Sequence, residues 1–194
     1  MQFPSVNPYV CVVFNQMGRK LVYKALVLVG VGTRLLPHPP NFTSIVAIAL
    51  FGGVYFSKRI AIILPLAAML IGDIFLGFYE VKLMASVYIS FLLCVFIGFW
   101  LKKHKKWHTV LGSSLLSSFL FFFLTNFAVW AFTPWYEKSL AGINECYLMS
   151  LPFFKHSLMG DLLYVVVFFG TYELIKLWVE KRFRVPAGDS VFVG

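Results

Sequence analysis

Seven side chains that could contact a small ligand stand in or beside five different apolar segments of this sequence. They are Arg34, Asn41, Thr43, Asp73, Asn126, Trp130 and Asp161. A carboxylate in membrane hydrocarbon costs on the order of 2.5 to 3.5 kcal/mol, so each such group is expected to face a partner or a wet cavity. Because these residues fall toward the same end of their segments, we expect them to gather at one level, the outer third of the protein.

Two interpretations of this cluster stay open. Arg34 could pair with Asp73 or Asp161 as a structural ion pair, since buried charges are usually paired. Alternatively, the same groups line a pocket that opens outward, with Trp130 and Trp135 supplying stacking surface. The two interpretations are compatible, because one side chain can do both.

A third interpretation, a proton-relay pump, requires ionisable groups distributed across the bilayer. Here only Glu173 lies deeper than the cluster. Lys176 follows it at i+3, a spacing at which the two side chains can pair. The distribution of ionisable residues therefore favours a pocket or a structural ion pair over a relay.

No motif for catalysis, nucleotide binding or a metal centre accompanies these residues. The sequence lacks a Gly-x-Ser-x-Gly, a His-Glu-x-x-His, a P-loop and a glycine-rich dinucleotide turn. His38, His156 and Cys146 show no metal-ligand spacing, and the three cysteines stand far apart. We therefore expect no enzyme, no cofactor and no metal site, and any uphill transport would need a partner or an ion gradient.

The composition is that of an integral membrane protein. Of 194 residues, 60% are hydrophobic and only 13% are charged, and the mean hydropathy is +0.82. So little polar surface cannot cover a soluble domain of this size. The net charge of +9 arises from basic residues between apolar runs, as in cytoplasmic membrane loops, so nucleic acid is not expected as a partner.

Six apolar segments predict an all-α bundle of six transmembrane helices within residues 17–184. They cover residues 21–36, 43–56, 60–79, 84–100, 110–130 and 158–179. The second is shorter than the roughly 20 residues that span a bilayer. If it crosses, only Arg34, Lys82, Lys138 and Lys155 of the 17 basic residues stay outside. The positive-inside rule therefore predicts six spans with cytoplasmic N- and C-termini.

The segments outside the spans differ in length and in expected role. Residues 1–16 precede a second methionine, Met17, and are expected to be an extension that is disordered or results from a mis-set start. Residues 185–194 are expected to form a cytoplasmic tail. Residues 131–157 are expected to form a long outer loop, and loops of that length are more often lids or binding loops than connectors.

Pairs of small residues spaced four apart indicate close helix contacts, because apolar burial drives little association within lipid. The pairs include Ala49 with Gly53, Ala68 with Gly72, and Ser114 with Ser118. A Gly-Asp pair also occurs twice in similar apolar contexts, at Gly72-Asp73 and Gly160-Asp161. Both Gly-Asp pairs are expected at the same outer level.

A family resemblance rests on several of these stretches taken together. They are Arg34-Leu-Leu-Pro-His-Pro-Pro-Asn-Phe-Thr, Ala47 to Gly53, Gly72-Asp73, Asn126 and Gly160-Asp161. They look like an uncharacterised bacterial six-helix membrane family, which resembles the S (substrate-binding) components of energy-coupling factor (ECF) vitamin transporters. The similarity covers roughly residues 20–180. It implies an S-component-like bundle in the bacterial inner (cytoplasmic) membrane, with a ligand pocket near the outer face.

The resemblance also implies partners besides the lipid bilayer. These are a small organic ligand, such as a vitamin or vitamin precursor, and an ECF energising module of one transmembrane subunit and two ATPases. S components dock such a module through small residues spaced four apart on the first helix. In this sequence Ala25, Gly30 and Gly32 of the first segment include no pair with that spacing.

Two functional hypotheses follow. The first is a membrane-embedded small-molecule binding and uptake protein in which the seven side chains named at the outset contact the ligand. The second is a non-transporting membrane scaffold, for instance in cell-envelope assembly, in which the same polar residues only hold helices together. A cavity lined by those side chains would favour the first hypothesis, and a filled interior at that level would favour the second.

Overall fold

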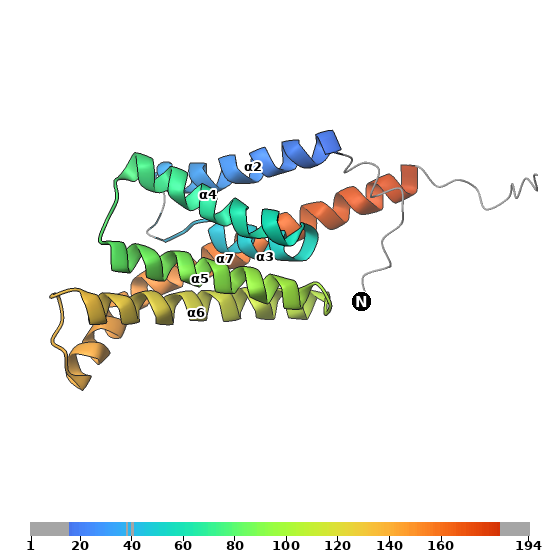
Figure 1. Ribbon diagram of the computed structural model, residues 1–194. Coiled ribbons are helices and arrows are strands. Elements are labelled where there is room, and N and C mark those ends of the chain that lie inside the picture. The colour runs from blue at the N-terminus through green and yellow to red at the C-terminus, as the bar shows by residue number, and fades with distance from the viewer. Residues whose placement is uncertain (1–15, 38, 40, 183–194) are drawn as a thin grey trace, which may run out of the picture.

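The structure, a computed structural model, describes residues 16–37, 39 and 41–182. These residues form six helices and no strand. The helices are α2 (Gln16–Leu35), α3 (Ile45–Tyr55), α4 (Lys58–Leu76), α5 (Val81–Leu101), α6 (Trp107–Phe132) and α7 (Leu140–Arg182), and they form one elongated bundle (Figure 1). The predicted tail 185–194, almost all of the predicted extension 1–16, and His38 lie outside the described residues.

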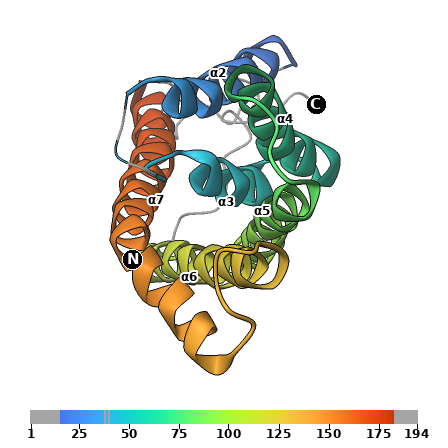
Figure 2. The same ribbon diagram turned by 90° about the vertical axis from the view of Figure 1, so that its left-hand side faces the viewer.

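Helix α3 lies at the centre of the bundle, with α2, α4, α5, α6 and α7 around it (Figure 2). Residues Ile45 to Val54 are all buried, as expected of a helix that is apolar on every face. Its 11 residues rise about 16 Å, roughly half the thickness of a bilayer's hydrocarbon. The predicted segment 43–56 is therefore a short core helix.

Four helices, α4, α5, α6 and α7, are long and apolar enough to cross a membrane. Helix α3 is apolar but short, and α2 carries four basic residues. Large apolar side chains such as Leu28, Phe96 and Phe123 are exposed on the bundle surface, where lipid would cover them. The prediction of an all-α, multi-pass membrane protein is confirmed at this level.

Helix α7 differs from the prediction of a long loop at residues 131–157. It begins at Leu140 and continues through Pro152, so that only residues 133–139 connect it to α6. Leu140, Ile143, Tyr147 and Leu151 recur at helical spacing, which is compatible with this extra length. The Tyr147 hydroxyl donates to the Phe123 carbonyl at 2.9 Å, which holds the added turns against α6.

The two ends of the bundle are distinguished by their connections. We call the end with the 77–80 turn and the 133–139 loop the cavity end, after the cavities described below. We call the end with the 102–106 turn the closed end (Figure 1). Helices α3 and α5 touch backbone to backbone toward the closed end, because a Cβ on Gly53 would lie 2.7 Å from the Gly98 Cα. Glycine at both positions permits this approach.

Candidate functional site

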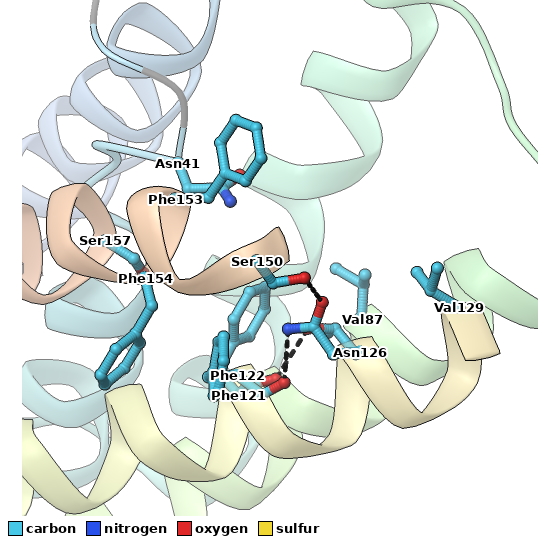
Figure 3. A pocket seen from close by; sticks show the side chains of 11 residues that line it. Asn41, Val87, Phe121, Phe122, Asn126, Val129, Ser150, Phe153, Phe154 and Ser157 are labelled. Carbon is cyan, nitrogen blue, oxygen red and sulfur yellow. Dashed lines mark hydrogen bonds between the residues drawn. The ribbon is translucent and has the colours of Figure 1, made fainter. Parts of the chain in front are cut away.

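Two adjoining cavities lie between the helices toward the cavity end. Their volumes are about 230 Å³ and about 210 Å³, and both are lined by Asn41, Val87, Phe121 and Ser157. The larger is also lined by Phe122, Thr125, Asn126, Val129, Ser150, Phe153 and Phe154 (Figure 3). The smaller is also lined by Arg34, Thr43, Val46, Met69, Tyr79, Phe91 and Asp161. The lining of the site combines aromatic, hydroxyl, amide and charged side chains.

The polar groups of the larger cavity are fixed by bonds within α6, within α7 and between the two helices. The Asn126 amide donates to the Phe122 carbonyl at 2.8 Å, and its oxygen accepts from the Ser150 hydroxyl (Figure 3). Ser150 also contacts the Cys146 carbonyl at 2.7 Å. Asn126 has one further amide hydrogen that these bonds do not use, so it can still donate to a ligand.

The smaller cavity contains charged groups from α2 and α7. The Asp161 side chain is buried and accepts a hydrogen bond from the Ser118 hydroxyl at 2.6 Å and a second from Ser157. Tyr79 lies in the 77–80 turn, where partial burial and then the Asp73 carboxylate raise its pKa to about 12. Its hydroxyl therefore stays protonated at neutral pH and can donate to a ligand.

Arg34 and Asp73 form a buried ion pair between α2 and α4. One Arg34 nitrogen, Nη2, lies 2.7 Å from Asp73 Oδ1, and the other, Nη1, donates to the Met69 carbonyl at 2.8 Å. The Tyr88 hydroxyl of α5 donates to the second Asp73 oxygen at 2.8 Å. The structural ion pair predicted for Arg34 is therefore present, and Asp73 is its partner.

The two Gly-Asp pairs have a shared packing role. A Cβ on Gly72 would lie 2.7 Å from Arg34 Nη1, and one on Gly160 would lie 3.2 Å from the Phe42 Cα. Gly72 thus leaves room for the Arg34 side chain, and Gly160 leaves room for Phe42, each directly beside a buried aspartate. Because Asn41 in this stretch has φ 63, a backbone conformation that asparagine tolerates, the chain can turn there into α3.

The comparison with known proteins assigns a family. The model of a family of unknown function, DUF6580, matches residues 14–184. The chain belongs to the DUF6580 family. No curated protein and no solved structure matches it. The match covers every described helix and all residues that line the two cavities, but the description of DUF6580 assigns neither activity nor ligand.

In this DUF6580 chain, the seven predicted residues have three kinds of location. Arg34, Asn41, Thr43 and Asp161 line the smaller cavity, and Asn41 and Asn126 line the larger one. Asp73 is not among the lining residues but neutralises Arg34. Trp130 lines neither cavity, and its indole N–H donates to the Glu137 carbonyl at 2.9 Å. Trp130 therefore anchors the 133–139 loop.

Several lining residues of this DUF6580 site were not predicted. Ser150, Phe153 and Phe154 fall in the stretch predicted to be a loop. Ser118 lines neither cavity but donates to Asp161, whereas its sequence spacing predicts only helix packing. Ser157 stands four residues before Asp161, which puts both on one helix face and is a usable sequence signal. Among the residues that the structure describes, no group of three His, Cys, Asp or Glu is placed to bind a metal.

Proposed function

We propose that the chain is a membrane-embedded protein that binds a small organic molecule and serves in its uptake. The proposal rests on the pair of adjoining cavities lined by polar and charged side chains inside an apolar bundle. Protein interiors are close-packed, and a void lowers stability unless something fills it. A cavity with fixed hydrogen-bonding groups and aromatic walls is the usual form of a small-molecule site.

The proposal includes six spans, with α2 and α3 counted as crossings and both termini in the cytoplasm. The cavity end then faces outward in the bacterial inner membrane. Lys58, Arg59 and the basic residues of the 102–106 turn lie at the closed end, which agrees with the positive-inside rule. This orientation lets a ligand enter from outside while the closed end separates it from the cytoplasm.

The ligand class and the energy source rest on the resemblance to ECF S components. A vitamin or vitamin precursor as ligand, and an energising module of one transmembrane subunit and two ATPases as partner, are parts of the proposal. The partner is tested by purifying the tagged chain from its native membrane under mild conditions. Stoichiometric ATPase subunits would support the module, and purification without them would favour a protein that acts alone.

Native mass spectrometry of the purified chain, with a cavity-filling variant, tests the binding function. Val87 lines both cavities, so Val87→Phe should displace a co-purifying small molecule. Ile89 on the same helix is 54% exposed, so Ile89→Phe adds the same ring to the surface and should retain the molecule. Absence of any small molecule from the wild-type protein, or its retention in Val87→Phe, would contradict the proposed site.

The alternative, a non-transporting membrane scaffold, has one observation in its favour. Asp73 and Asn126 are already bonded to groups within the chain, as structural residues would be. For a scaffold, Val87→Phe would fill unused space and leave the function intact. For a binding protein, the same variant would fold and lose both its ligand and uptake.

A further inference from the structure

The two buried aspartates near the cavities differ in their partners. Asp73 accepts bonds from the Arg34 guanidinium and the Tyr88 hydroxyl, so its charge is compensated. Asp161 is 2% exposed and accepts bonds only from hydroxyls, those of Ser118 and Ser157, in the part of the chain described. No Lys, Arg or His nitrogen within residues 16–37, 39 and 41–182 forms a salt bridge with it.

Asp161 is also the aspartate that lines a cavity. Arg34 lines the same cavity, but its charge is balanced by Asp73. With all three groups ionised, the region therefore carries one uncompensated negative charge. Buried charges are normally paired, and a buried charge without its partner carries a large free-energy cost. A positive group on a ligand would supply the partner that the protein does not.

The other walls of this cavity suit the same kind of ligand. Tyr79, Phe91 and Phe121 line it beside Asp161. Aromatic faces attract cations through the ring quadrupole, and the attraction strengthens when water is excluded. An anionic ligand would meet the charge of the Asp161 carboxylate, so the lining disfavours it.

We propose that the smaller cavity binds the protonated nitrogen of a small organic cation, which donates a hydrogen bond to the Asp161 carboxylate. This inference rests on the proposed binding function and names the chemical class of its ligand. The rest of the ligand extends past Asn41 and Phe121 into the larger cavity, where Asn126 can donate to it. The two cavities, of about 230 Å³ and about 210 Å³, together reach the volume typical of small-molecule sites, so together they can hold a small organic cation.

Three probes of similar size but different charge test this inference on the full chain in detergent. Benzylamine is cationic, benzyl alcohol is neutral and benzoate is anionic, and thermal stability is measured with increasing concentrations of each. Benzylamine should stabilise the wild-type protein most and benzoate least. Equal effects of benzylamine and benzyl alcohol, no effect of benzylamine at millimolar concentration, or a preference for benzoate would overturn the assignment.

Two variants test whether benzylamine binds at Asp161. Asp161→Asn removes the charge and should weaken benzylamine binding by at least about thirtyfold, the loss expected when one member of a buried charge pair is neutralised. Glu145 lies exposed on the same helix, so Glu145→Gln should bind benzylamine as the wild-type protein does. Undiminished binding by Asp161→Asn would overturn the inference. If that variant does not fold, the order in which the three probes stabilise the wild-type protein still supports or overturns the inference.

Sodium chloride, compared with benzylamine hydrochloride at equal ionic strength, separates an inorganic from an organic cation. Stabilisation by sodium alone, without stabilisation by benzylamine, would overturn the inference. A neutral or anionic small molecule that co-purifies with the wild-type protein and is displaced by Val87→Phe would also overturn it while leaving the proposed function intact. Failure of the proposed function gives a different result, since no co-purifying molecule would then be found.

Discussion

The two ends of helix α3 are packed in opposite ways. Toward the closed end, α3 and α5 meet through Gly53 and Gly98, and Phe51 and Tyr55 contact rings of α7. Toward the cavity end, polar bonds link α2 to α4 and α6 to α7, and two cavities lie between the helices. Small residues bring helices together to form a seal, whereas polar bonds between larger side chains can hold space open.

The hydroxyl bonds of two tyrosines reflect the same difference. At the cavity end the Tyr88 hydroxyl lies 2.8 Å from Asp73. At the closed end the Tyr55 hydroxyl lies 3.4 Å from Glu173, which also pairs with Lys176 at 4.0 Å as its i+3 spacing predicts. The closed end therefore depends mainly on packing and the cavity end mainly on directed bonds.

The largest effect is expected from Arg34→Leu. It leaves the Asp73 carboxylate buried without its cation, which should cost about 3 to 5 kcal/mol of unfolding free energy. Denaturant titration of the purified protein measures the loss. The double variant Arg34→Leu, Asp73→Leu should regain most of it, because neither charge of the pair then remains buried without its partner. A single variant as stable as the wild type would show that the ion pair does not hold the cavity end.

A smaller loss is expected from Gly98→Ala at the closed end. The new Cβ would lie 2.8 Å from the Leu50 carbonyl oxygen, and overpacking a helix contact in this way should cost about 3 kcal/mol. Gly112 has open space around it, so Gly112→Ala should be neutral or stabilise α6 by up to about 1 kcal/mol. Equal stability of the two alanine variants would contradict the backbone contact between α3 and α5.

The smallest effects come from removing one tyrosine hydroxyl at each end. Tyr88→Phe breaks a short bond to a carboxylate and should cost about 1.5 to 3 kcal/mol. Tyr55→Phe breaks a long one and should cost less than about 1 kcal/mol. Thermal unfolding of both variants in one detergent gives the difference. A larger loss at Tyr55 would reverse the comparison between the two ends.

Much of the site's location could be predicted from sequence because charged residues are costly in lipid. Arg34, Asn41, Thr43 and Asp161 lie in or beside three of the predicted segments, yet all four line one cavity. The choice between Asp73 and Asp161 as partner of Arg34 could not be made, since both have the same depth in their segments. Packing decides it: Gly72 gives the guanidinium room to lie across α4 beside Asp73.

The larger cavity was less predictable for a different reason. Its α7 wall, from Ser150 to Phe154, belongs to turns that extend the helix beyond the length needed to cross a bilayer. The apolar run that marks a span begins only after them, and Pro152 within them favours a break. Contacts with α6, such as the Asn126 to Ser150 bond, stabilise the helix there.

The 11-residue length of α3 also bears on how the protein is made. A segment this short lacks the length by which a single helix is held across a bilayer, and its burial leaves it without lipid contact. Its neighbours α5, α6 and α7 are synthesised after it. Helix α3 can therefore be packed on all sides only after α7 has been synthesised, so the core of the bundle is completed at the end of biogenesis.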